Sequence, residues 1–268
     1  MNLNYKDKNV VFYTNCQGGI GINKLLQSVC KFKSIHYIET FSTIWNKKDL
    51  PLNIIKNADI FICQPINIKY GKYSTNTTID NNILSHLKVG CIKIIFPYIY
   101  FACLFPLFYA NAGAEIDGGV SYDISKIVNR DIIFQLKQTH TNDEIISLYD
   151  SQNIDFKFEE NLKDTIERIK THEIHCNIKI THLFTMDNIK NIKLMHTNNH
   201  PTNYVLKYIT NEVLKILELP ESKFNSVNTE ILSQVPYSLY SYNFFKFTWL
   251  NPKDCNENIY KKLLKDLL

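Results

Sequence analysis

Residues 10–19 read Val10-Val11-Phe12-Tyr13-Thr14-Asn15-Cys16-Gln17-Gly18-Gly19 and join an apolar run to a thiol and two glycines. The apolar run has the length of a buried strand, and apolar residues then recur at helical spacing from Ile22 to Val29. Gly18 and Gly19 allow a sharp turn and a close approach of backbone to a ligand. The first amides of a helix lack internal partners and favour a thiolate, a phosphate or an oxyanion. We therefore predict that Cys16 is a nucleophile at the start of a helix; the alternative is a small buried apolar side chain.

The first half of the chain alternates strand-like and helix-like runs. This order is typical of a three-layer α/β fold with a mainly parallel sheet. The strands are expected at residues 10–13, 35–40, 60–63 and 92–96, and the helices at 20–32, 51–57 and 79–87.

The second half has more helical patterns. Helices are expected at 130–136, 143–149, 159–175 and 202–217, a further strand at 192–196, and a short terminal helix from Asn256. The helix at 202–217 has a clear apolar face, and Pro201 suits its first position, which makes His200 its cap residue. We expect one domain over residues 1–268, with a sheet-rich half (1–128), a helical half (129–220) and a C-terminal extension (221–268).

Composition excludes several classes of function. The net charge of +4 is small and its lysines and arginines are dispersed, so nucleic acid is not an expected partner. The seven cysteines are odd in number and scattered, and residues 1–9 are polar, which favours reduced thiols in a cytoplasmic protein. Histidines and cysteines show no zinc spacing, and the glycines match no nucleotide-binding fingerprint, so neither a metal nor such a motif is expected.

One apolar segment, residues 94–110, carries no charge. Pro97 and Pro106 interrupt it, so it is not expected to span a membrane. We interpret it as a buried strand followed by the wall of an apolar pocket.

Polar side chains follow several of the expected strands. Ligands of parallel sheets bind at the carboxyl ends of the strands, where strand order reverses. This rule selects a set of positions from four strands: Asn15, Cys16, Gln17, Gly18, Gln64, Tyr98, Asn199 and His200. A thiol with a histidine, helix amides and a side-chain amide from Gln64 or Asn15 are the parts needed for acyl transfer. The structural alternatives are a strand-end hydrogen bond for Gln64, a turn for Asn199 and a helix cap for His200.

Four short motifs resemble the WcbI-type polysaccharide biosynthesis family, in the family's order over residues 9–217. They are Thr14-Asn15-Cys16-Gln17, Ile62-Cys63-Gln64-Pro65, Phe96-Pro97-Tyr98-Ile99-Tyr100-Phe101 and Thr197-Asn198-Asn199-His200-Pro201-Thr202. The resemblance implies an α/β fold, binding of coenzyme A or acetyl-coenzyme A, and acetyl transfer to a sugar hydroxyl of a capsular or surface polysaccharide. It carries over Cys16, Gln17, Gln64 and His200 as matching positions.

The chain is also distantly similar to SGNH-type esterases, in keeping with an SGNH- or Rossmann-like topology. Cys16 would replace the serine and His200 would be the histidine, but Thr197 occupies the aspartate position and the Gly-Asp-Ser signature is absent. The third member of a triad is therefore unassigned. A thioesterase or carbohydrate esterase, and a non-catalytic coenzyme-A-binding protein of a polysaccharide pathway, remain alternatives to the transferase.

Overall fold

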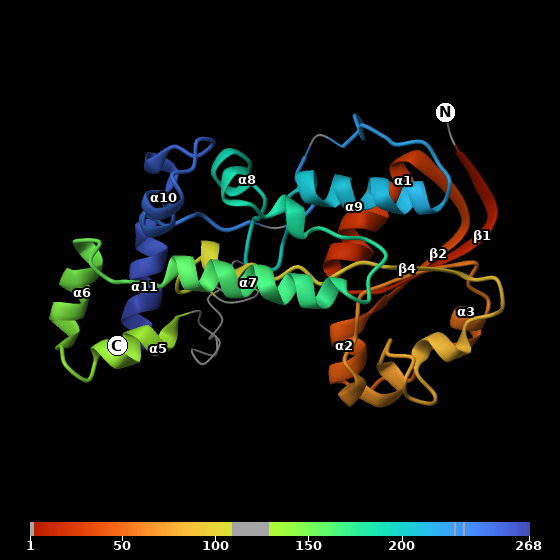
Figure 1. Ribbon diagram of the computed structural model, residues 1–268, viewed down its shortest axis with the longest axis horizontal. Coiled ribbons are helices and arrows are strands. Elements are labelled where there is room, and N and C mark those ends of the chain that lie inside the picture. The colour runs from red at the N-terminus through yellow and green to blue at the C-terminus, as the bar shows by residue number, and fades with distance from the viewer. Residues whose placement is uncertain (1–2, 109–128, 228, 233) are drawn as a thin grey trace. The chain divides into compact units, whose positions relative to one another are not determined.

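The protein was analysed as a computed structural model that describes residues 3–108, 129–227, 229–232 and 234–268. The chain divides into two compact units, each assembled from separate segments (Figure 1). The first comprises Met1–Tyr98, Ile169–His182 and Thr202–Leu232, and the second comprises Ile99–Arg168, Leu183–Pro201 and Ser233–Leu268. The prediction that all 268 residues form one domain stays a prediction.

A four-stranded parallel sheet is the centre of the first unit. Its strands are β1 (Leu3–Thr14), β2 (Cys30–Glu39), β3 (Ile60–Cys63) and β4 (Ile92–Ile95), in the order β2-β1-β3-β4. The chain passes from β1 to one neighbour and then crosses to the other side of β1. Strand order therefore reverses between β1 and β3, where Tyr13 pairs with Cys63. The predicted α/β fold with a parallel sheet is confirmed.

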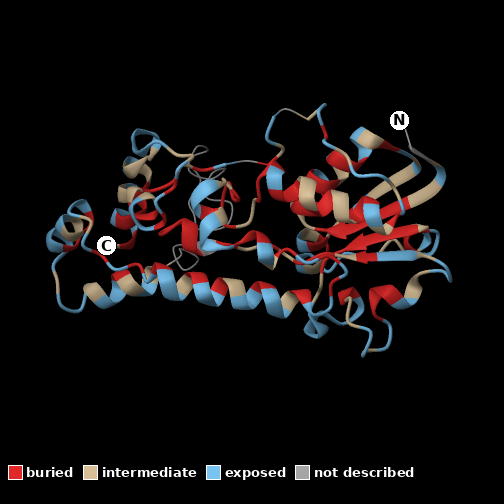
Figure 2. Cartoon of the chain, turned by 45° about the horizontal axis from the view of Figure 1, so that its top comes forward, coloured by how far each residue is buried: buried red, intermediate tan, exposed pale blue. Residues whose placement is uncertain are grey.

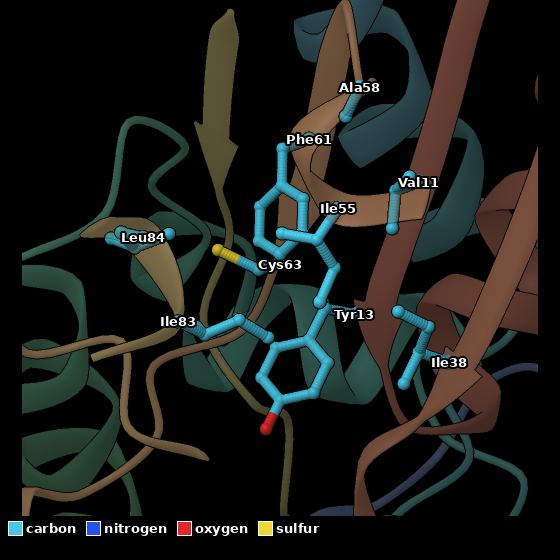
Figure 3. Packing of buried hydrophobic residues seen from close by; sticks show 9 residues of the cluster. All are labelled: Val11, Tyr13, Ile38, Ile55, Ala58, Phe61, Cys63, Ile83 and Leu84. Carbon is cyan, nitrogen blue, oxygen red and sulfur yellow. The ribbon is translucent and has the colours of Figure 1, made fainter. Parts of the chain in front are cut away.

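Side chains of alternate strand residues point to opposite faces of this sheet, and other elements cover both faces. One face packs on α3 (Leu52–Lys56) and η3 (Ile83–His86) through a cluster shown in Figure 3: Val11, Tyr13, Ile38, Ile55, Ala58, Phe61, Cys63, Ile83 and Leu84. Fully burying one such aliphatic or aromatic side chain stabilises the fold by about 1.5–3 kcal/mol. Figure 2 accordingly shows the middle of the sheet as buried.

The other face is covered by α1 (Asn23–Val29) and α9 (Asn203–Ile216), which lie opposite α2 (Thr40–Trp45) and α3 in Figure 1. Leu25, Leu26, Val205, Leu206 and Ile209 are buried there. A Cβ added to Gly21 would lie 2.9 Å from the Leu206 side chain, so the glycine permits the chain to approach α9 closely. Both faces of the sheet are thus covered, which explains why the central strands are continuous apolar runs.

The second unit is helical and has its own aromatic core. Phe101, Phe105 and Phe108 are buried, with ring centroids 4.7, 4.6 and 4.8 Å from those of Phe184, Tyr237 and Tyr260, respectively. Its helices are α5 (Arg130–Leu136), α6 (Asn142–Asp150), α8 (Met186–Asn191), α10 (Leu239–Phe245) and α11 (Glu257–Leu267), and α7 (Phe158–Glu173) begins within it. The rings of residues 101–108 fill this core, which corrects their interpretation as a pocket wall; residues 109 and 110 lie outside the described part.

Several expected elements differ from those observed. Residues 30–32, expected at the end of a helix, open β2, because α1 ends at Val29. Residues 192–196 form no strand: Met195 makes a single antiparallel bridge with Pro201. The following helix begins at Asn203 with Thr202 as its N-cap, so His200 is not the cap and Pro201 is not the first helical residue. The helix expected at 79–87 is reduced to the one-turn η3. Among the described residues, no helix combines the length and apolarity needed to cross a membrane.

Candidate active site

Cys16 lies where β1 ends and a helix begins. The helix opens as a π-helix, η1 (Gln17–Ile22), and continues as α1; Cys16 already has helical backbone angles, φ −57° and ψ −28°. The Asn15 side chain caps this start, because its Oδ1 accepts a hydrogen bond from the Gln17 N–H at 2.9 Å. The Asn15 carbonyl accepts another from the Gly19 N–H at 3.0 Å. Short π-helical turns occur frequently at functional sites, and here one follows the predicted nucleophile directly.

A buried pair of glutamines joins the ends of β1 and β3. Gln64 Oε1 accepts a hydrogen bond from the Asn15 N–H at 3.0 Å, and Gln64 Nε2 donates one to Gln17 Oε1 at 3.0 Å. Gln17 and Gln64 are 0% and 3% exposed. The structure therefore brings Asn15, Cys16, Gln17 and Gln64 together as the sequence predicted. Gln64 thus makes the strand-end hydrogen bonds that were its structural alternative, and its role as a donor to an oxyanion stays a prediction.

The two glycines after Gln17 are required by packing. A Cβ on Gly18 would lie 2.6 Å from Thr14 Oγ1, and one on Gly19 would lie 1.9 Å from Cε2 of Tyr37. Neither glycine has a positive φ angle. The expected sharp glycine turn is thus corrected: the glycines let the helix start lie against β1 and the Tyr37 ring.

The electrostatics of Cys16 are opposite to the prediction of a stabilised thiolate. Burial raises the pKa of the Cys16 thiol above its ordinary value, the Glu39 charge raises it further, and the backbone N–H groups of Cys16 and Gln17 only partly oppose this. Burial also raises the pKa of the Tyr37 phenol, with the charges of Glu39 and Cys16 adding to the effect. The amides predicted from the helix start are present, but the loss of solvent outweighs them. Burial therefore favours the protonated thiol at Cys16 and the protonated phenol at Tyr37.

Tyr37 and Glu39 were not among the predicted site residues. Both come from the carboxyl end of β2, and Glu39 caps α2 by accepting hydrogen bonds from the N–H groups of Phe41 and Ser42. Applying the strand-end rule to the second predicted strand as well as to its neighbours would have selected Glu39. Tyr98, which was predicted, lies partly exposed just beyond β4, after Phe96, whose N–H donates to the Cys63 carbonyl at 3.1 Å.

His200 and Asn199 belong to the second unit, where they form a tight turn. Thr197 Oγ1 accepts hydrogen bonds from the N–H groups of Asn199 (3.3 Å) and His200 (3.1 Å) and donates one to Asn199 Oδ1 (3.0 Å). The His200 carbonyl accepts from the His196 N–H at 2.7 Å. Thr197, at the triad-acid position of the esterase pattern, is therefore a turn-forming residue, and Asn199 uses its amide oxygen within the turn.

Neighbouring contacts hold this turn to the aromatic core of its unit. Asn198 Nδ2 donates to the Phe108 carbonyl at 3.1 Å, and the Phe101 N–H donates to the Asn198 carbonyl at 2.6 Å. His200 itself is partly exposed. Within the described ranges, no group of three or more His, Cys, Asp or Glu side chains is arranged to hold a metal ion.

Comparisons with known proteins agree with this architecture. The family model described as "Polysaccharide biosynthesis enzyme WcbI" matches residues 9–222. A solved structure of WcbI, described as a novel polysaccharide biosynthesis enzyme, is 18% identical, with a TM-score of 0.72 over 97% of this chain and 89% of that one. It is described as the native protein without a disulfide bond between coenzyme A and one of its cysteines. No curated protein matches. From the family match, the chain belongs to the WcbI family of polysaccharide biosynthesis enzymes.

Proposed function

We propose that this protein binds acetyl-coenzyme A with the thioester beside Cys16 and transfers the acetyl group to a hydroxyl of a capsular or surface polysaccharide precursor. The observation that carries the proposal is the neutral, partly buried Cys16 thiol at the point where strand order reverses. Ligands of open parallel sheets bind at this place. Family membership and the mention of coenzyme A in the description of the solved WcbI structure support the choice of donor.

The residues around Cys16 fit the thioester end of such a donor. A thioester and its pantetheine arm are uncharged, and they match a site where burial disfavours both a thiolate at Cys16 and a phenolate at Tyr37. The Gln17–Gln64 hydrogen bond and the Asn15 cap hold the backbone beside the thiol in one geometry. Such fixed positioning is a main source of catalytic rate in group transfer.

Bound acetyl-coenzyme A supplies an acetyl group already activated for attack by a hydroxyl oxygen. In the proposed reaction, His200 takes the proton of the acceptor hydroxyl, because a neutral imidazole is a suitable base near neutral pH. The new bond joins the acceptor oxygen to the acetyl carbon, and the bond from that carbon to sulfur breaks. Coenzyme A leaves as the thiol after its sulfur takes up the proton held by His200. The raised pKa of Cys16 favours direct transfer, in which the thiol contacts the donor without becoming acetylated.

The test is a transfer assay with acetyl-coenzyme A and a panel of sugar acceptors, following both acetylated sugar and released coenzyme A. We expect His200→Gln to lower transfer by about 10²–10⁴-fold, the usual contribution of a general base, and the exposed His175→Gln control to leave it unchanged. Direct transfer also predicts no acetyl adduct of about 42 Da on Cys16 in mass spectra of the reacting enzyme.

The alternatives give different results in the same assay. A thioesterase or carbohydrate esterase would release acetate at full rate without sugar. A non-catalytic binding protein would bind coenzyme A equally well as wild type or His200→Gln and turn nothing over. Failure of coenzyme A to bind the wild-type protein would refute the donor.

A further inference from the structure

An exposed aromatic pair lies on α2, directly after the carboxyl end of β2. Phe41 and Trp45 are 67% and 75% exposed, and their rings stack with centroids 5.7 Å apart and planes 15° apart. Figure 1 shows α2 extending from the sheet at this end of β2. Two large rings exposed side by side form an apolar surface of the kind that marks a binding site. The pair follows Glu39, which pairs with Thr14 where β1 ends, so it belongs to the same edge of the sheet as the candidate active site.

Positive charge lies next to this pair. Lys48 Nζ donates a hydrogen bond to Ser42 Oγ at 2.6 Å, which holds the ammonium group against α2, the helix that carries the pair. Lys47 is exposed in the same turn, and the nearby Asp49 carboxylate is paired with Lys72 at 3.2 Å. Because Ser42 is a neutral partner, Lys48 keeps its charge for a ligand. An aromatic face beside ammonium groups is complementary to a ligand that is both aromatic and anionic.

Glu39 adds a third feature. It lies at the end of β2, where it pairs with Thr14 at the end of β1. A carboxylate at the carboxyl end of a parallel strand is placed to accept a hydrogen bond from a ribose hydroxyl of a ligand bound at that edge of the sheet. The Glu39 oxygens already accept from the N–H groups of Phe41 and Ser42, but an ionised carboxylate has about four acceptor positions and can take a further donor.

We propose that Phe41 and Trp45 are a stacking platform for the base of a nucleotide, whose phosphates meet Lys47 and Lys48 and whose ribose donates to Glu39. A nucleotide satisfies all three features, whereas a neutral sugar would leave the lysines unused. Two sources offer this chemistry: the adenosine 3′,5′-bisphosphate end of coenzyme A, which rests on the proposed function, and the nucleoside diphosphate of an activated sugar.

Tryptophan fluorescence and calorimetry test the platform. Trp45 and Trp249 are the two tryptophans, so Trp45 can be followed alone in a Trp249→Phe background. We expect coenzyme A and adenosine 3′,5′-bisphosphate to change its emission, and pantetheine to leave it unchanged. Base stacking on an aromatic ring predicts that Trp45→Ala raises the Kd for coenzyme A by about 5- to 150-fold and leaves the Kd for pantetheine unchanged. Phe134→Ala, which removes an exposed ring from α5, should change neither.

These binding measurements distinguish a failure of the stacking platform from a failure of the proposed function. If uridine diphosphate changes Trp45 emission and Trp45→Ala abolishes its binding, while coenzyme A does neither, the platform is supported and its source is an activated sugar. If coenzyme A and pantetheine bind, and Trp45→Ala binds coenzyme A as tightly as wild type does, the platform is refuted and the proposed donor survives. If coenzyme A binds no more tightly than adenosine 3′,5′-bisphosphate and pantetheine does not bind, the platform stands and the thioester site at Cys16 falls. Binding of no nucleotide at all refutes the platform.

Discussion

Replacing Gly19 with alanine tests whether Tyr37 fixes the position of the Cys16 loop. The new Cβ would lie 1.9 Å from Cε2 of Tyr37 and 2.2 Å from Cδ2 and Cζ. Carbon atoms in contact are separated by about 3.5–4.0 Å, so the ring has to move by more than about 1 Å. Such overpacking costs about 1–3 kcal/mol, whereas alanine in a helix is worth up to about 1 kcal/mol over glycine. We therefore expect Gly19→Ala to lower the free energy of unfolding by about 1–2 kcal/mol.

Removing the Tyr37 ring should reverse the sign of the stability change that Gly19→Ala causes. In a Tyr37→Ala background only the helix propensity remains, and Gly19→Ala should raise the free energy of unfolding by up to about 1 kcal/mol. Urea denaturation of wild type, both single variants and the double variant gives the coupling energy, which we expect to be about 1–3 kcal/mol. A matched cycle that pairs Gly19→Ala with Tyr70→Ala, another exposed tyrosine, should show no coupling. Equal destabilisation by Gly19→Ala with and without Tyr37 would refute the packing argument.

Three further predictions address the site. Gln64→Leu should lower the free energy of unfolding by about 2–4 kcal/mol in urea, since it removes two hydrogen bonds and leaves buried partners unpaired. Because Gln17 and Gln64 bond to each other, the losses in Gln17→Leu and Gln64→Leu should not add in the double variant; additive losses would argue against the network. Alkylation of Cys16, followed by peptide mass spectrometry, should show a thiol pKa above the ordinary value. The folded chain holds the Cys16 proton more tightly than the unfolded chain does. Cys16 therefore stabilises the fold at low pH, and this contribution is lost as pH rises through the titration of the thiol. If the stability of a Cys16→Ser variant falls with rising pH as steeply as that of the wild type, this explanation is contradicted. Thr197→Val should cost about 1–2 kcal/mol by removing the acceptor for two backbone N–H groups of the His200 turn, and Thr197→Ser should restore it; equal losses in the two would exclude the hydroxyl.

The central part of the sheet could be predicted because both of its faces are covered. Continuous apolar runs such as residues 60–63 are typical of strands that are buried on both faces. The first halves of β1 and β2 were missed because they pair beyond the covered part of the sheet, where Lys6, Asp7 and Lys8 accompany a shift in register. The strand predicted at residues 192–196 was wrong because Leu194 and Met195 are buried by tertiary packing without a neighbouring strand. Their apolar pattern in the sequence is the same as that of a buried strand.

The residues that make up the site could be predicted, but their hydrogen-bond partners and the pKa shift of Cys16 could not. Strand ends lie together at one edge of a parallel sheet, so Asn15, Cys16 and Gln64 could be expected together, and the hydrogen bond between Asn15 and Gln64 confirms that these strand ends meet. Gln64 and Gln17 bond to each other because their side chains meet where water is excluded, and no spacing in the sequence reports that. The same exclusion of water raises the pKa of Cys16, in the direction opposite to the prediction. The prediction used the helix start, which the sequence indicates, but the sequence does not indicate how deeply one thiol is buried.

Protection of Cys16 by acetyl-coenzyme A, whose sulfur is blocked as a thioester and does not consume the alkylating agent, tests the central proposal most directly. Cys16, Cys91 and Cys255 are all partly exposed, so the last two serve as internal controls in peptide-resolved alkylation. With acetyl-coenzyme A at 100 times its Kd, measured by calorimetry, alkylation of Cys16 should slow by about 100-fold while the control cysteines react at unchanged rates. Alkylation of Cys16 at the same rate with and without saturating acetyl-coenzyme A would contradict the placement of the donor thioester at this residue.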